Sequence, residues 1–331
     1  MAVRRVAPAV GLFVLAPLVG EYLLGNVSLG APVYLLLLGP MYGGAAVVVR
    51  EIARRAGLGW PGILLLALAY GLAEEGLATQ TLFNRSYLGY DLLGPAYVPA
   101  LGMGAWWTLF VLTLHTVWSI SVPIALIEAL VPDRRATPWL GHAGLLVAAV
   151  LFAVGAVVTA MGTYTETRFL ASPAQLTGTV VAVAGCVVAA FAAGRLRPAA
   201  EDRAAPGPWP VGALTFGAGS LFLLLGHRPG WAAAGGYVVL YAVVTAAVLR
   251  WSRRTGWGAP HVLALAGGAV LAYAWHAFPQ HPVLGPAGGA DLIGNAVLAA
   301  GALALVAVGA AAVSRVPEDV PSRTPPAVDP R

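Results

Sequence analysis

The sequence predicts an all-α fold, a polytopic bundle of about ten transmembrane helices with both termini in the cytoplasm. Three observations predict it: the composition, the length of the apolar runs and the placement of the arginines. Of the 331 residues, 59% are hydrophobic and only 10% are charged, whereas about 25% are charged in an average soluble domain. So few charges cannot cover a soluble core of this size, but a lipid bilayer solvates apolar surface and removes that need.

Ten apolar runs have the length that an α-helix needs to cross roughly 30 Å of hydrocarbon, about 20 residues each. The predicted spans are 6–24, 30–49, 58–80, 103–131, 140–162, 174–194, 209–226, 231–249, 259–277 and 290–313. They make residues 1–314 one helical domain, with most intramembrane polar groups in about 1–140 and plainer apolar sequence in about 140–314. The Pro-rich residues 315–331 are predicted to form a disordered cytoplasmic tail.

The arginines predict the orientation. All 19 basic residues are arginine, and 16 of them fall in alternate loops and at the two termini. The three on the other side are Arg85, Arg168 and Arg228. Because loops that carry excess arginine stay in the cytoplasm, this alternation places both termini inside and predicts a protein of the cell membrane.

Several functions find no support in the sequence. The arginines form short clusters rather than one patch, so nucleic-acid binding is not expected despite the net charge of +5. The expected partners are the lipid bilayer and an unknown membrane-embedded or lipid-linked substrate. Cys186 is the only cysteine, so no intramolecular disulfide can form. The nucleotide-binding glycine patterns and the common hydrolase motifs are absent, and no cofactor is expected.

Two adjacent glutamates, Glu74 and Glu75, lie in the outer third of the third predicted span. An ionisable group inside the membrane costs about 2.5–3.5 kcal/mol on insertion scales, so a pair needs a functional or structural reason. Adjacent residues point about 100° apart on an α-helix, so both are not expected to face one partner equally. Glu51 and Glu128 differ, because they lie near inner helix ends among arginines, where ordinary surface pairing explains them.

His115 lies in the fourth predicted span, which returns inward. It comes eight or nine residues after Trp106 and Trp107, which are typical of the outer interfacial belt. The two spans are consecutive, so His115 and Glu75 are expected to meet at one depth. Ser119 shares the face of His115. Pro123 cannot donate a backbone hydrogen bond, so a kink is expected nearby.

Further polar residues collect at the same outer level. His276 and His281 follow the ninth span, and Asp291 and Asn295 open the tenth. Sequence order neither forces nor forbids that they join the glutamates. A zinc site usually needs three protein ligands, and His276 or His281 would have to supply the third. An imidazole at the interface is explained without a metal, so we expect no stoichiometric metal.

The block from 70 to 125 resembles two families. A glutamate pair in one helix and a histidine in the next resemble the CPBP intramembrane proteases, relatives of the CAAX prenyl endopeptidases, which carry EExxxR, FxxxH and a later HxxxN or HxxxD. The resemblance implies that Glu74 or Glu75 activates a water and that His115 binds the nucleophile or the oxyanion. In this sequence Thr79 occupies the position of the arginine in EExxxR, and Val111 occupies the position of the phenylalanine in FxxxH. Glu-Glu-Gly followed by His-x-x-x-Ser-Ile-Ser-x-Pro-Ile also resembles an uncharacterised bacterial membrane protein family.

Three functions are compatible with these residues. The first is an intramembrane hydrolase, such as a protease, in which Glu74, Glu75 and His115 are catalytic. The second is a transporter or proton-coupled carrier in which the same residues relay protons. The third is a membrane assembly protein or an enzyme that acts on a lipid-linked substrate. A hydrolase needs the glutamates and the histidine to face each other, whereas a carrier also needs a polar path to the other side.

Overall fold

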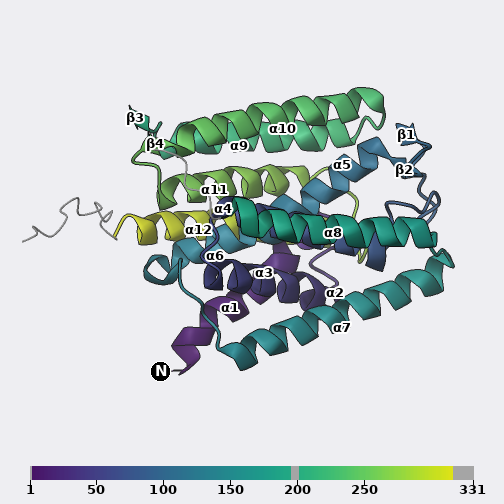
Figure 1. Cartoon of the computed structure of the whole chain (residues 1–331), viewed down its shortest axis with the longest axis horizontal. Helices are drawn as coiled ribbons and strands as arrows, with labels where there is room; N and C mark the ends of the chain where they lie inside the picture. The colour runs from purple at the N-terminus through teal and green to yellow at the C-terminus, as the bar shows by residue number, and fades with distance from the viewer. Residues whose placement is uncertain (1, 195–200, 316–331) are drawn as a thin grey trace, which may run out of the picture.

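The computed structural model describes residues 2–194 and 201–315, and it is an all-α helical bundle as predicted (Figure 1). In chain order its elements are α1 (Ala2–Pro17), η1 (Leu18–Tyr22), α2 (Val33–Leu38), η2 (Gly39–Gly43), α3 (Gly44–Arg55), α4 (Trp60–Ala73), η3 (Glu74–Ala78), β1 (Tyr97–Val98), β2 (Met103–Gly104), α5 (Ala105–Thr113), η4 (Leu114–Ser121), α6 (Val122–Leu130), η5 (Pro132–Arg134), α7 (His142–Thr167), α8 (Pro173–Ala193), β3 (Glu201–Ala204), α9 (Pro208–Gly226), α10 (Trp231–Ser252), β4 (Arg254–Thr255), α11 (Ala259–His276) and α12 (Gly289–Val313). The segments η1 to η4 are π-helical, and η5 is a 3₁₀ turn.

Each predicted span coincides with a helical segment. Eight helices in the described residues are long and apolar enough to cross a membrane, and a shorter apolar helix covers Val6–Tyr22. The ninth predicted span corresponds to α11, which has 18 residues. The chain is therefore a multi-pass membrane protein. The crossing of all ten segments and the orientation of the termini stay predictions, and the predicted tail at 316–331 lies outside the described residues.

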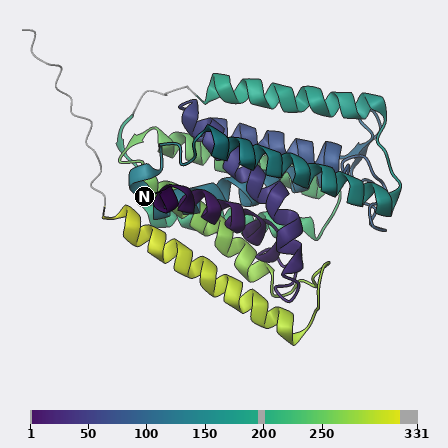
Figure 2. The ribbon, with the colours of Figure 1, turned by 90° about the horizontal axis from the view of Figure 1, so that it is seen from below.

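The helices differ in burial, with some packed in the centre of the bundle and others at its periphery. In Trp60–Ala78 and Ala105–Leu130, 61% and 67% of the most apolar stretch is buried, against 11% in both α7 and α8. In Figure 2 the yellow helix α12 lies along one edge of the bundle. The outer helices present Val and Leu side chains outward, for instance Val147, Val181 and Leu303, which is the surface that lipid solvates and water does not.

Helix ends follow from local chemistry. Proline occupies one of the first two positions of α4, α8, α9 and α11, where its missing N–H costs nothing. Ser172 caps α8 by accepting a hydrogen bond from the backbone of Gln175, whose side chain accepts in return from Ser172. This capping box satisfies two otherwise unpaired N–H groups at the N-terminal end of the helix.

Small residues allow close contacts between the helices of the N-terminal half. A Cβ on Gly43 would lie 2.1 Å from the backbone oxygen of Phe13, so α1 crosses η2 almost in backbone contact. A Cβ on Gly155 would lie 2.5 Å from the backbone nitrogen of Met41. Close approach of this kind is typical of glycine in membrane bundles. It fixes η2 between α1 and α7.

The two ends of the bundle differ in their connections. At one end, on the left in Figure 1, lie the N-terminus, β3, β4 and the end of α12. At the other end lies the long connection with β1 and β2, which pair antiparallel through Tyr97–Gly104 and Val98–Met103. The strands β3 and β4 pair in parallel and link the loop before α9 to the loop before α11. The arginine-rich loops of the sequence therefore meet at one end.

Candidate functional site

Four π-helical segments supply one buried polar cluster at the end of the bundle opposite the arginine-rich loops. The segment η1 carries Glu21, η2 carries Tyr42, η3 carries Glu74 and Glu75, and η4 carries His115. A π-helical turn replaces the i→i−4 hydrogen bonds by i→i−5 bonds and is frequent at functional sites. In the described residues every π-helical segment contributes to this cluster. Close to Pro123, where the sequence predicts a kink, the helix is π-helical over η4, and Val122 N–H donates to Val117 O.

His115 lies between the two glutamates. Its Nε2 is 2.8 Å from Oε1 of Glu75, and its Nδ1 is 3.0 Å from Oε2 of Glu74. Nδ1 also lies 3.2 Å from the hydroxyl of Ser119, as the shared helix face predicts. Both glutamates contact this one histidine, but not equally: Glu75 forms a hydrogen bond with Nε2, whereas Glu74 makes a charge contact with Nδ1 that is not aligned as a hydrogen bond. All three side chains are buried.

Glu75 is the anchored carboxylate. The hydroxyl of Thr79 donates to Oε2 of Glu75 at 3.0 Å, and the hydroxyl of Thr81 donates to the same oxygen. Trp107 Nε1–H in turn donates to Thr81 at 2.9 Å. Hydrogen bonds from hydroxyls compensate the lost hydration of a buried carboxylate. Thr79 and Thr81 thus hold one oxygen of Glu75, while its other oxygen faces His115.

Glu74 is less satisfied. Its Oε2 is close to His115 but is not aligned for a hydrogen bond, and in the described residues it has no hydrogen-bond partner. The hydroxyl of Tyr70 is buried close to the Glu74 carboxylate and interacts with it. The Tyr70 ring lies 5.9 Å from the His115 ring, in an edge-on arrangement. Buried polar atoms that lack a protein partner are the usual positions of bound water or of a ligand atom.

Tyr42 connects the glutamate pair with the first helix. Its ring centroid is 5.8 Å from that of His115, and its hydroxyl donates to Oε1 of Glu21 at 2.5 Å. Asn26 donates to the other oxygen of Glu21, also at 2.5 Å. Gly20 lets η1 pack closely against both η4 and Tyr42, because a Cβ there would lie 3.0 Å from the hydroxyl of Ser119 and 3.2 Å from the Tyr42 ring. The polar network therefore extends from η3 through η4 to η1.

The long connection between η3 and α5 continues this network. Thr81 lies in it, and Asn84 and Leu82 are buried beside it. Burial is the main cause that raises the pKa of Tyr87 in this connection to about 12, and the charge of Glu75 adds to the effect. The hydroxyl of Tyr87 therefore stays protonated at neutral pH.

The other outer polar residues do not join the cluster. His276 instead contacts His227, with 3.2 Å between the Nε2 atoms, and Gln280. Asn295 donates to the backbone oxygen of Ala277 and lies 3.4 Å from Asp291. No contact of exposed His281 with the glutamates occurs in the described part of the chain. The candidate site therefore contains only some of the polar residues that the sequence places at this level, and it excludes His276, His281, Asp291 and Asn295.

A second charged cluster, here called the inner cluster, consists of Arg50, Glu51, Arg54, Arg55 and Glu128. Arg50 contacts Glu51 at 2.7 Å and Glu128 at 3.1 Å, and Arg54 binds Glu128 through two nitrogens, at 2.8 and 2.5 Å. Arg55 contacts Glu51 at 3.2 Å. The pairing with arginine was predicted, but its position at the surface was wrong. Glu51 is 0% exposed and Glu128 is 5% exposed, because α3 and α6 pack directly against each other.

The glutamate–histidine cluster has the composition of a metal site. One ligand atom each from Glu74, Glu75 and His115 lies within 4.8 Å of the other two. Imidazole nitrogen and carboxylate oxygen are common zinc ligands, and three protein ligands leave a fourth position open. The two glutamates and His115 thus provide three possible ligands, whereas the sequence analysis required His276 or His281 as the third. The expectation that no stoichiometric metal binds stays a prediction.

Sequence reasoning missed Tyr42 and Tyr70 as members of the cluster. A signal existed for Tyr70, which lies four residues before Glu74 and therefore on its face of the helix. Tyr42 had a weaker signal, a hydroxyl in the middle of the second span. Its proximity to Glu21 depends on how α1 and η2 cross, and the crossing of two helices cannot be predicted from the sequence alone.

The fold and the cluster define a multi-pass membrane protein with a buried polar centre. Comparison with protein families identifies the chain further: residues 11–317 match an uncharacterised membrane protein family, and the chain belongs to this family. The match supports the second of the two resemblances seen in the sequence and does not extend to the CPBP proteases. No curated protein and no solved structure matches the chain.

Proposed function

We propose that the protein is an intramembrane hydrolase whose acid–base centre is formed by Glu74, Glu75 and His115. The observation that carries the proposal is that each ring nitrogen of one buried histidine faces a glutamate carboxylate. Hydrolysis of an amide or ester needs a carboxylate base, a positioned water and a group that stabilises the oxyanion. These three side chains supply the base and the stabilising group.

The two glutamates have different roles in this proposal. Glu75 is held by Thr79 and Thr81 and orients the His115 ring. Glu74 is the general base, because its Oε2 accepts no well-aligned hydrogen bond in the described residues and can therefore accept one from a water. The water oxygen attacks the carbonyl carbon while Glu74 takes the proton. His115 then stabilises the oxyanion, the bond to the leaving group breaks, and the proton passes to that group.

An apolar layer favours a hydrolase over a carrier. Ala46 on α3 and Ile124 on α6 are both 0% exposed. They lie one helical turn before Arg50 and Glu128, between the level of His115 and the inner cluster. A carrier would need polar side chains across this level to conduct its substrate or protons. The residues of α3 and α6 at this level, Ala46 and Ile124, are apolar. A hydrolase needs only the outer site.

The substrate class follows from the depth of the centre. Glu74, Glu75 and His115 lie within predicted spans and are each about 5% exposed. A water-soluble substrate would have to leave water to reach them. A membrane-embedded peptide or a lipid-linked ester already lies at this level, so these are the substrates that we propose.

The test is hydrolysis by purified protein in lipid nanodiscs. Quenched fluorogenic transmembrane peptides and lipid-linked esters serve as substrates. Glu74→Gln and His115→Asn are expected to lower the rate by about 10²–10⁴-fold, the usual contribution of a positioned acid or base. Glu166→Gln, which changes an exposed carboxylate in the loop-proximal part of α7, is the matched control and should keep the rate.

Two outcomes would contradict the proposal. The first is unchanged hydrolysis in Glu74→Gln and His115→Asn. The second is no hydrolysis of either substrate class, together with proton uptake into proteoliposomes that Glu74→Gln abolishes. The second result would assign the same residues to a proton-coupled carrier.

A further inference from the structure

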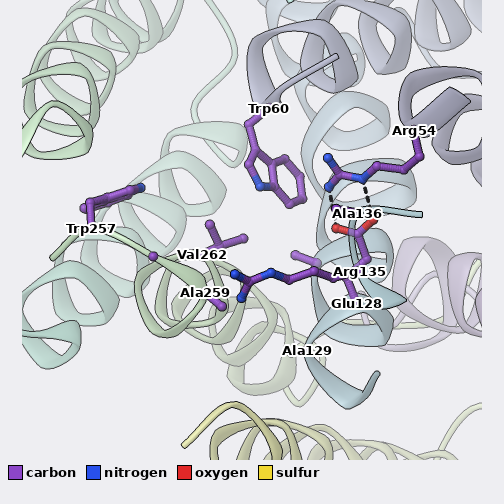
Figure 3. Close-up of a pocket in the computed structure, with 11 residues that line it drawn as sticks. Arg54, Trp60, Glu128, Ala129, Arg135, Ala136, Trp257, Ala259 and Val262 are labelled. Atoms are coloured by element: carbon purple, nitrogen blue, oxygen red, sulfur yellow. Dashed lines mark hydrogen bonds and ion pairs between the residues drawn. The ribbon is translucent and has the colours of Figure 1, made fainter. Parts of the chain in front are cut away.

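A cavity of about 270 Å³ opens at the arginine-rich end of the bundle, far along the helices from the glutamate–histidine cluster. It lies between α4, α6 and the start of α11, beside the connection that precedes α7 (Figure 3). One water in the liquid occupies about 30 Å³, so the cavity is large enough for a small polar group. Its walls contain Arg54, Arg135, Glu128, Trp60 and Trp257.

The two arginines of the cavity differ in their contacts. Arg54 is neutralised by its two hydrogen bonds to Glu128. The side chain of Arg135 is exposed and has no hydrogen-bond or ion-pair partner in the described part of the chain. In Figure 3 it points past Glu128 toward Ala259 and Val262. The cavity therefore offers one uncompensated guanidinium.

The surroundings add positive charge. The inner cluster has three arginines and two glutamates, so it carries one positive charge in excess. The helix α11 begins at Ala259 in the wall of the cavity, and the N-terminal end of a helix favours an anion. In the described residues Glu128 is the only acidic side chain in the wall, and two guanidinium groups already bind it.

We propose that this cavity binds the headgroup of an anionic phospholipid, with the phosphate on Arg135. Guanidinium groups bind phosphate oxygens strongly. Basic pockets between transmembrane helices on the cytoplasmic side are typical sites of anionic lipid headgroups. The arginine-rich end is the predicted cytoplasmic end. This site is separate from the proposed hydrolase centre and does not depend on it.

The apolar part of the wall distinguishes a lipid from a free anion. Trp60 and Trp257 are half-buried at this end of the bundle. Tryptophan is enriched at membrane–water interfaces, which is where the ends of membrane-spanning helices lie. The ring of Trp257 stacks on that of His261 at 4.7 Å, so it is held in place. Ala125, Ala129 and Val262 complete the wall. Inorganic phosphate would leave this apolar surface uncovered, whereas the glycerol and upper acyl region of a lipid covers it.

The experiment titrates the purified full chain in neutral detergent with short-chain phosphatidylglycerol, short-chain phosphatidylcholine or inorganic phosphate. Binding is measured through the thermal midpoint of unfolding. Phosphatidylglycerol should raise the midpoint, and Arg135→Gln should weaken its binding about tenfold or more, as expected for loss of a charge-assisted contact. The control is Arg253→Gln, which removes the same charge from an exposed position outside the cavity wall.

Each other result overturns the proposal. Equal losses in Arg135→Gln and Arg253→Gln would show that only net charge matters. Equal binding of phosphatidylcholine would exclude recognition of the anion, and equally tight binding of inorganic phosphate would exclude the lipid as the source. Trp257→Ala is the second variant. It should weaken the binding of phosphatidylglycerol, measured as the shift of the midpoint relative to the same variant without lipid. Unaltered binding in this variant would show that the apolar wall does not take part in the site.

Discussion

The inner cluster and the glutamate–histidine cluster are both buried and charged, yet they are built differently. In the inner cluster every carboxylate binds two arginines, and Glu51 also accepts from the backbone N–H groups of Trp139 and Leu140. In the glutamate–histidine cluster, referred to below as the outer cluster after its predicted side, two carboxylates share one histidine, and Oε2 of Glu74 accepts no well-aligned hydrogen bond in the described residues. The carboxylates of the inner cluster are thus fully paired, although Nε of Arg55 is buried without a hydrogen-bond partner in the described residues. Fully paired carboxylates are typical of structural stabilisation, whereas carboxylates that share too few donors are typical of a site that binds or reacts.

The backbone follows the same division. The inner cluster lies on regular α-helix in α3 and α6, while the outer cluster lies on π-helical turns. A regular helix satisfies each backbone group with the least distortion, so π-helical turns persist where another requirement outweighs that cost. The comparison teaches that buried charge alone does not mark a functional site. The degree of hydrogen-bond saturation and the backbone geometry distinguish the two.

The largest expected effect is all-or-none and concerns the sides of the membrane. In a Cys186→Ala background, Arg228→Cys should react with an impermeant thiol reagent from outside, and Arg253→Cys only after permeabilisation. The reason is the distribution of arginine between alternate loops. Labelling of intact cells measures it. Reaction of position 253 from outside would put the inner cluster and the lipid cavity on the outer face.

Breaking the inner cluster is expected to be the most costly single substitution. Glu128→Ala should lower the free energy of unfolding by about 3–5 kcal/mol, because it leaves Arg54 without its carboxylate and the buried Arg50 with Glu51 alone. Equilibrium unfolding in mixed micelles measures the loss. Asp133→Ala removes an exposed carboxylate nearby and should have little effect. If Glu128→Ala lowers the free energy of unfolding no more than Asp133→Ala does, the inner cluster does not stabilise the fold.

A smaller loss is expected where α8 packs against the outer cluster. A Cβ on Gly76 would lie 2.6 Å from Cγ2 and 2.9 Å from the hydroxyl of Thr179. Gly76→Ala should therefore cost about 1–3 kcal/mol by overpacking. Gly185→Ala is the matched control on α8, since nothing lies within 4 Å of its Cβ. Similar unfolding curves for both variants would show that η3 and α8 separate without cost.

Glu75→Gln should change the free energy of unfolding by less than about 1 kcal/mol and leave membrane insertion normal. The amide keeps an acceptor for Thr79 and Thr81 and removes the cost of burying a charge. Activity in the nanodisc assay should nevertheless be lost. A variant that inserts poorly, or that unfolds as readily as Glu128→Ala, would make the outer cluster structural and would remove the contrast between the two clusters.

The smallest expected effect is a null result for metal. Elemental analysis of purified protein, repeated on His115→Ala, should find far less than one zinc per chain in both. The proposed hydrolysis then relies on the glutamates and the histidine alone. About one zinc per chain, lost in His115→Ala, would contradict this prediction and would turn the partnerless oxygen of Glu74 into a metal ligand.

The sequence predicted the helices well because lipid imposes one simple requirement. Every backbone group must be hydrogen-bonded within its own helix, and the helix must be apolar over a fixed length. The run 140–162 was recognised by this rule and is α7, His142–Thr167. The third span was predicted to reach residue 80 but ends at Ala78, because Gln80 has a positive φ of 55° that no helix continues.

Of the candidate site, the sequence by itself determined the meeting of Glu75 with His115, because two consecutive antiparallel helices place residues of equal depth side by side. The tertiary structure decided the rest. It brought Glu74 to the same histidine through a π-helical turn, added Tyr42 and Glu21 through the crossing of α1 and η2, and kept His276 away. Hydropathy and charge set the depth and direction of each helix, but the rotation and neighbours of a helix depend on side-chain packing between segments distant in sequence.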